Sequence, residues 1–183
     1  MLFGWQNLSA QTWKLVKNSE KNLIENFENI SHEKIITMKI GDLIAKYWRE
    51  KTQELIREHS LIEINKYKKW EKYKVNETLT KSAQNHADDM SKKNYFDHKN
   101  LNWKHVWDRV DSNNYNYKYL WENISNDNNI SDVVMSYLRS TKWWHEEILE
   151  EKYEDIGIWL SPISNIITEN PKYYFVFNFW KSF

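Results

Sequence analysis

The sequence predicts an α+β fold in which helices cover both faces of a small sheet. Two observations carry this prediction. Apolar residues recur at helical spacing through most of the chain before residue 140, whereas residues 172–180 are aromatic at both odd and even positions. A strand that is apolar on both sides must be covered on both sides. Because helices come first and strands last, the layers belong to an α+β architecture and not to an alternating one.

Residues 1–57 are predicted to form a helical extension, and residues 58–183 the main domain. In the extension, Leu23, Phe27 and Ile30 lie on one predicted helical face, and a second run of this kind follows near residue 43. The segment carries no chemical motif. Its amphipathic period favours a role in attachment or in self-association through these helices.

The main domain begins with the end of a helix and continues with a helix that Asn76 is expected to cap. One face of this second helix is an apolar stripe. A short helix near Val106 and a helix capped by Asn129 or Ser131 follow. The strands are predicted at 155–160 and 172–180, joined by a hairpin loop. The stripe of the second helix consists of Leu79, Ala83, His86, Ala87 and Met90.

Composition excludes several classes of function. The 26 basic and 26 acidic residues cancel, so binding of nucleic acid by net charge is not expected. The absence of cysteine excludes disulfides, thiolate metal sites and cysteine nucleophiles. Three widely separated glycines exclude a glycine-rich phosphate loop. No apolar run is long enough for a transmembrane segment, and no signal peptide is visible at the start of the sequence.

Two histidines and one acid stand out as candidates for chemistry. His98 and His145 lie beside acidic residues in predicted loops or helix ends, and Glu122 is expected just before an extended turn. Two imidazoles and a carboxylate suit Zn²⁺ or a similar cation with an open water position. The alternative is that His98 and Glu122 hydrogen-bond each other and hold two loops together. His86, on the apolar stripe, is interpreted as a structural histidine, and Arg109 as part of an internal ion pair or cap.

The string from Leu79 to Met90 and the loop that ends at His98 resemble the CAP superfamily of cysteine-rich secretory, antigen 5 and pathogenesis-related 1 proteins. The resemblance covers about residues 58–182 and is closest to the bacterial branch without cysteine. It implies a three-layer α-β-α sandwich around a small antiparallel sheet, with a cleft lined by two histidines and two acids. The other matching strings are Asp108-Arg109, Glu122-Asn123-Ile124 and the segment from Tyr153 to Gly157.

The resemblance carries only half of the cleft over to this chain. His98 matches the first family histidine and Glu122 the acid of the Glu-Asn-Ile motif. The second acid falls at Ser140, and the second histidine falls at Lys152. The resemblance therefore implies that the metal site of the family is partly degraded here.

Tryptophans stand at or beside several positions that the family keeps open. Bacterial members place a histidine where this chain has Trp143, and His145 lies two residues further on. Family glycines are replaced by, or lie beside, Trp103, Trp121 and Trp159. Glycine at such positions indicates a close backbone approach or a positive φ, neither of which is expected of tryptophan. We therefore expect a narrowed cleft.

The sequence thus predicts an extracytoplasmic CAP-domain binding or interaction protein, without catalysis and with no required cofactor. Its location rests on the resemblance alone, and its partner is an unknown protein, lipid or carbohydrate. Trp103, Trp143 and Trp144 are candidates for an exposed aromatic platform, the alternative being core packing. Two further functions stay open. One is a divalent-metal hydrolase in which Glu122 acts as general base on water held by His98 and His145; the other is lipid or sterol binding.

Overall fold

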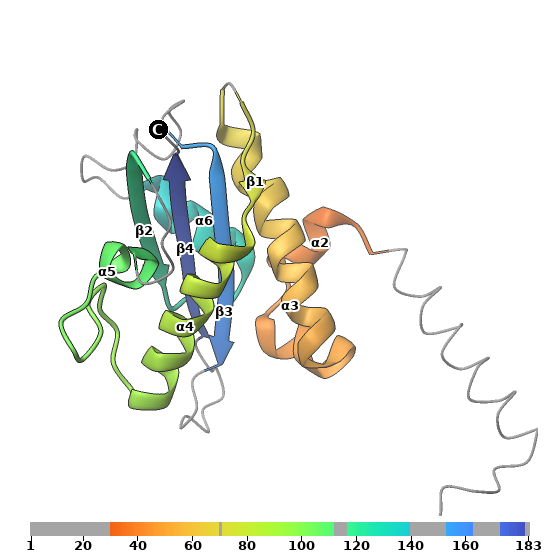
Figure 1. Cartoon of the computed structure of the whole chain (residues 1–183). Coiled ribbons are helices and arrows are strands. Elements are labelled where there is room, and N and C mark those ends of the chain that lie inside the picture. The colour runs from red at the N-terminus through yellow and green to blue at the C-terminus, as the bar shows by residue number, and fades with distance from the viewer. Residues whose placement is uncertain (1–29, 70, 112–116, 140–152, 163–172, 182–183) are drawn as a thin grey trace, which may run out of the picture. The chain divides into compact units, whose positions relative to one another are not determined.

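The computed structural model describes residues 30–69, 71–111, 117–139, 153–162 and 173–181. The chain divides into two compact units, 1–34 and 35–183, and the sheet lies in the second unit (Figure 1). The helices are α2 (His32–Thr37), α3 (Ile40–Tyr67), α4 (Glu77–Lys93), α5 (Val106–Asp111) and α6 (Ile130–Arg139). The strands are β1 (Lys74–Val75), β2 (Tyr119–Ser125), β3 (Asp155–Pro162) and β4 (Tyr173–Lys181).

The four described strands form one sheet in the order β1-β3-β4-β2. Strand β4 is antiparallel to both of its neighbours, and the two-residue strand β1 runs parallel to β3. In this register Asn178 of β4 stands between Gly157 of β3 and Glu122 of β2. The neighbouring antiparallel strands β3 and β4 agree with the predicted hairpin, whose connecting loop lies outside the described residues.

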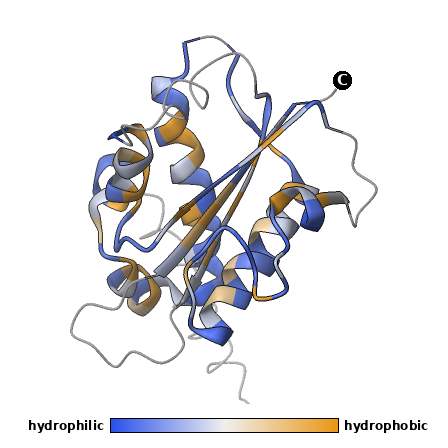
Figure 2. Cartoon of the chain, turned by 90° about the vertical axis from the view of Figure 1, so that its left-hand side faces the viewer, coloured by the Kyte–Doolittle hydropathy of each residue, from blue (hydrophilic) through white to orange (hydrophobic). Residues whose placement is uncertain are grey.

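Helix α4 packs on one face of the sheet, and α3 and α6 pack on the other (Figure 2). On the α4 face, Ala83 and Met90 belong to one cluster with Tyr174 and Val176 of β4. On the opposite face, the ring of Phe177 meets the ring of Tyr137 from α6 edge-on at 5.1 Å. Every residue of β4 from Tyr173 to Phe179 is buried. The predicted α-β-α sandwich, with a final strand covered on both sides, is confirmed.

The ends of α4 follow from local hydrogen bonding. The Oδ1 of Asn76 accepts from the backbone N–H groups of Thr78 and Leu79 at 3.0 and 3.2 Å, so the predicted cap is confirmed. At the other end Asn94 adopts a left-handed conformation with φ 53°, which asparagine tolerates better than most residues. For α6, Asn129 is the capping residue, since its Oδ1 accepts from the N–H of Asp132.

Helix α3 passes through the boundary at 57/58 that the sequence suggested. Residues 57 and 58 both lie within this helix, and the second compact unit begins at Ile35, so the division into an extension and a main domain stays a prediction. The helix is instead interrupted at Trp48, which has φ 47° and ψ 173°. About half of the proposed extension, residues 1–29, lies outside the described residues.

Strand β2 differs from the sequence prediction, because Glu122 was expected ahead of an extended turn and instead lies inside a seven-residue strand. The physical reason is its place in the sheet. Strand β2 pairs only with β4 among the described strands, and most of its residues are partly exposed. An edge strand of this kind lacks the continuous apolar run that made β4 recognisable.

Gly157 permits the contact between β3 and α4. A Cβ added there would lie 2.1 Å from the backbone carbon of Leu79, which has no flexible end that can move aside. We predict that Gly157→Ala lowers the free energy of unfolding by about 2–3 kcal/mol, measured by urea denaturation.

Gly41→Ala is the matched control. Its added Cβ would meet the Tyr173 hydroxyl at an ordinary 3.5 Å, and alanine favours a helix by up to about 1 kcal/mol. Equal stability of Gly157→Ala and the wild type would contradict this account of how α4 and β3 pack.

Candidate functional site

The carboxylate of Glu122 is the centre of the site. Strand β2 places its side chain beside Asn178 on the α4 face of the sheet, where only 3% of the residue is exposed. His98 Nδ1 lies 3.1 Å from Oε1, and since a carboxylate only accepts, the imidazole donates. Arg109 forms an ion pair with Oε2. The amide of Asn178, in the orientation that its neighbours require, also donates to Oε2 at 3.2 Å and accepts from the N–H of Ala83.

Arg109 joins this carboxylate to the loop between α4 and α5. Its NH1 donates to the backbone carbonyls of His98 and Lys104, each at 3.0 Å. Its neighbour Asp108 accepts from the N–H of His105 at 2.8 Å, at the start of α5. These contacts agree with the internal ion pair and cap expected for this pair of residues. The guanidinium therefore fixes the segment from His98 to Lys104 at both of its ends.

His86 lies beneath the same cluster and is almost fully buried. Its Nε2 lies 2.9 Å from the carbonyl oxygen of Asp97 and 3.8 Å from Oε1 of Glu122. A carbonyl only accepts, so Nε2 carries a hydrogen and Nδ1 is an acceptor. Nδ1 meets no hydrogen-bond partner within the part of the chain that the structure describes. Burial lowers the pKa of His86, outweighing the nearby Glu122 charge, so this imidazole is neutral.

The donors around Glu122 decide its charge state. Burial alone would raise the pKa of this carboxyl, but the hydrogen bond from His98 and the charge of Arg109 outweigh burial and lower it. Glu122 is therefore an ionised carboxylate at neutral pH. A buried carboxylate with a guanidinium and two further donors is a compensated charge and not a free base.

Two pockets adjoin the ion pair. A pocket of about 180 Å³ has Glu122 and His98 on its wall, and the rest of its lining is largely aromatic. A second, more polar pocket of about 240 Å³ has Arg109 and His86 on its wall. The first pocket is completed by His105, Val106, Trp107 and Trp121, and the second by Ser82, Asn85, Asp89, Asn100, Lys104 and Asp108.

The structure brings two of the predicted site residues together, His98 and Glu122. His145 lies outside the described residues, as do Trp143 and Trp144. Trp103 is described, and its side chain stands in solvent.

The expectation that tryptophan avoids a positive φ is wrong at Trp103, which has φ 62°. The other two tryptophans of that prediction, Trp121 and Trp159, are partly buried. Trp103 thus adopts a left-handed backbone that glycine would adopt freely, in spite of its indole.

Sequence reasoning missed the part that His86 and Asn178 play. His86 was assigned to the core, and it is buried as expected, but it also lies against the carboxylate. The signal for Asn178 was present, because it is the one amide in a run of aromatic and aliphatic residues from Tyr173 to Trp180. A polar side chain in a strand covered on both faces needs a buried polar partner.

The described residues do not fit a divalent cation at this site. Within them, no group of three His, Asp or Glu side chains is placed to hold a metal ion. Both oxygens of Glu122 already accept hydrogen bonds, and the Arg109 guanidinium would repel a cation placed beside them. The third candidate ligand, His145, lies outside the described residues, as do Ser140 and Lys152, the positions where the resemblance places the second acid and the second histidine of the family.

The sequence pattern of the cysteine-rich secretory protein family, CAP, matches residues 43–179. The chain therefore belongs to this family, and its lack of cysteine fits the cysteine-free bacterial branch. No curated protein gives a significant match.

Two solved bacterial structures have a similar fold. An outer surface protein of Borrelia burgdorferi has a TM-score of 0.59 at 19% identity, and the match covers 70% of this chain and 93% of that chain. An extracellular protein of Bacillus anthracis that contains an SCP domain has a TM-score of 0.55 at 16% identity, over 84% of this chain and 44% of that chain. Among the described residues, no helix has the length and apolarity needed to cross a bilayer.

We predict that Arg109→Met lowers the free energy of unfolding by about 3 kcal/mol, because it leaves the buried Glu122 carboxylate without its cationic partner. Combining it with Glu122→Gln, which removes the charge but keeps an acceptor for His98, should restore about 1–2 kcal/mol. Urea denaturation of the wild type, Arg109→Met and the double variant measures these differences. A double variant less stable than Arg109→Met would contradict the ion pair as the central interaction.

The buried His86 is expected to make the stability of the protein depend on pH. Its folded pKa lies below the unfolded value of 6.5, so the unfolded chain binds more protons and stability is lost as pH falls below that value. We expect the urea midpoint to fall between about pH 7 and pH 5, and to fall less in His86→Gln. If the urea midpoint fell equally with pH in the wild type and in His86→Gln, His86 would not be the group responsible for the loss of stability.

Proposed function

We propose that this protein is an extracytoplasmic CAP-domain binding or interaction protein, without catalytic activity, in which the His/Glu cleft of the family is partly degraded. The observation that carries the proposal is the full use of the Glu122 carboxylate by internal donors. A general base must be free to accept a proton from a bound water. Here both oxygens hold the protein together, and Arg109 keeps the carboxyl ionised and engaged.

The fold holds a surface loop in a fixed position, as a binding role requires. The ion pair fixes the loop from His98 to Lys104 at two backbone carbonyls. Binding surfaces on loops that a rigid scaffold holds in place lose little entropy when a partner arrives. The extracytoplasmic location is supported by family membership and by the two similar bacterial structures, which belong to an outer surface protein and an extracellular protein.

The metal-dependent hydrolase is the weaker candidate. It needs His98 and Glu122 as a ligand and a base, together with His145, and the first two are occupied by each other. Lipid or sterol binding as a carrier needs a long apolar cavity, whereas the largely aromatic pocket beside Glu122 measures about 180 Å³. A cavity of about 150 Å³ accommodates one benzene ring, so this pocket suits a single ring or side chain and not a sterol.

Titration of the full chain with Zn²⁺ by calorimetry tests the degraded cleft. We expect no stoichiometric complex with either the wild type or His98→Ala. A one-to-one complex that His98→Ala abolishes would overturn the proposal and revive the hydrolase. A one-to-one complex that His98→Ala leaves intact would place the metal elsewhere and leave the cleft degraded as proposed.

A further inference from the structure

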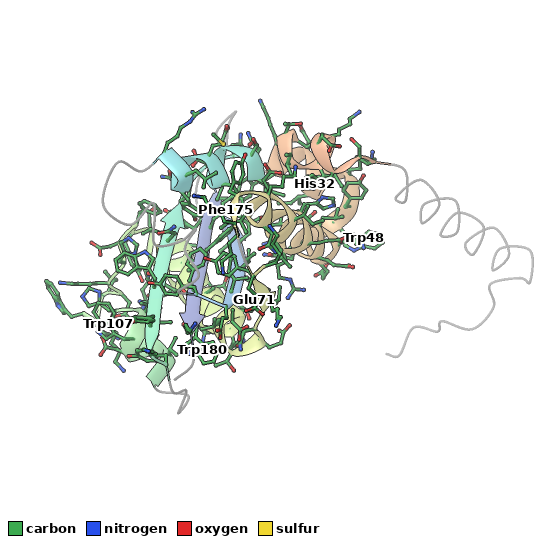
Figure 3. All side chains as sticks on the ribbon, turned by 90° about the horizontal axis from the view of Figure 1, so that it is seen from above. His32, Trp48, Glu71, Trp107, Phe175 and Trp180 are labelled. Atoms are coloured by element: carbon green, nitrogen blue, oxygen red, sulfur yellow. The ribbon has the colours of Figure 1, made fainter. Side chains whose placement is uncertain are left out.

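The loop between α4 and α5 presents apolar side chains to solvent. Leu101 is 58% exposed, Trp103 is 78% exposed and Trp107, at the start of α5, is 41% exposed. We call residues 99–104 the tip of this loop. Figure 3 shows Trp107 and Trp48 on opposite sides of the second compact unit. The surface around Trp107 is therefore separate from the surface around Trp48. Large apolar side chains gathered in solvent mark an interaction site more often than isolated ones do.

Folding does not account for Trp103. Its φ of 62° is unfavourable for a bulky residue, and glycine would adopt it freely. Its indole gains little burial in return, because most of the ring surface stays in water. Trp103 thus combines an unfavourable backbone conformation with an apolar ring exposed to water. Such a combination indicates that the residue serves a function other than folding.

The tip is positively charged. Lys99 Nζ lies 5.2 Å from the centroid of the Trp103 ring, and Lys104 closes the tip on the other side. Two acids flank the tip, and each accepts a backbone N–H at 2.8 Å: Asp97 from Lys99, and Asp108 from His105. A third acid, Asp89, lines a pocket together with Lys104. Residues 99–104 themselves contain two lysines, two large apolar side chains and no acid, so cationic and apolar groups share the tip.

The tip is also held in one shape. The Oδ1 of Asn100 accepts from the N–H groups of Asn102 and Lys104 at 2.9 and 3.0 Å. The N–H of Trp103 donates to the carbonyl of Asn100 at 2.8 Å, and Arg109 holds the carbonyl of Lys104. A surface organised in advance loses little conformational entropy on binding.

We propose that this tip docks on an anionic lipid bilayer. Trp103 and Leu101 enter the boundary between headgroups and acyl chains, and Lys99 and Lys104 contact lipid phosphates. Tryptophan prefers this boundary because its ring is apolar and its N–H can hydrogen-bond. The aliphatic Leu101 favours a bilayer over a polysaccharide, since stacking on sugar rings uses aromatic faces and gains nothing from leucine. The inference names a partner for the proposed interaction protein and in that sense rests on the proposed function.

The test is co-sedimentation of the full chain with vesicles of phosphatidylcholine mixed with phosphatidylglycerol, and with vesicles of phosphatidylcholine alone. We expect binding to the mixed vesicles to be the stronger and to weaken as salt is added. Trp103→Gly should lower the partition coefficient about tenfold, and Lys99→Gln and Lys104→Gln about fivefold each. Trp103→Gly relieves the backbone at φ 62°, so its thermal midpoint should equal or exceed that of the wild type.

Trp48→Gly is the matched control. Trp48 is also an exposed tryptophan, at 61%, with a positive φ of 47°, but it lies in α3 on the other side of the unit. This variant should bind vesicles as the wild type does. Absence of wild-type binding to the mixed vesicles would overturn the proposal, as would an equal loss of binding in both glycine variants.

A soluble anionic polysaccharide, heparin, separates the two kinds of anionic partner. If heparin competes fully with the vesicles and Leu101→Asn binds them as the wild type does, the tip recognises a polyanion and the bilayer proposal is wrong. If Leu101→Asn weakens vesicle binding and leaves heparin binding unchanged, the bilayer proposal is supported. None of these results depends on the zinc titration, so failure of the tip and failure of the degraded cleft are distinguishable.

Discussion

The buried charge of Glu122 is the constraint on which the arrangement of the sandwich around this site depends. A carboxylate so little exposed to water is tolerated only when donors replace its hydration shell. Those donors come from three places: His98 in the loop after α4, Arg109 in α5 and Asn178 in the central strand β4. One side chain on an edge strand therefore determines how a loop, a helix and the middle of the sheet meet. The neutral state of His86 follows from the same burial.

Strong periodicity made much of this fold predictable from the sequence. The apolar stripe of α4 and the doubly covered strand β4 were recognisable because each involves many residues that obey one spacing. Asn76 was recognisable because asparagine is a preferred N-cap residue and stands just before the stripe. Strand β2 escaped prediction, because pairing on one side leaves its burial irregular. The strand preference of a residue type depends on its packing against neighbours and differs between edge and central strands, so residue types alone do not identify an edge strand.

The candidate site was predictable only in part, and for a different reason. The approach of His98 to Glu122 followed from the resemblance to a family, since spacing over 24 residues contains no geometry of its own. Arg109 was recognised as an internal partner but not as the counter-ion of this particular carboxylate. The positive φ of Trp103 ran against the intrinsic preference of tryptophan, which shows that the surrounding hydrogen bonds outweigh that preference here.

The anchoring of the loop by Arg109 has a consequence for how this protein can diverge. The guanidinium binds main-chain carbonyls of His98 and Lys104. Every residue type offers this backbone carbonyl, whatever its side chain. Between these two points Asn100 holds the turn through its side-chain Oδ1, so exchange is open to the neighbouring side chains that face solvent, such as Leu101 and Trp103. Related chains can exchange them and acquire new specificities while the architecture underneath is inherited unchanged.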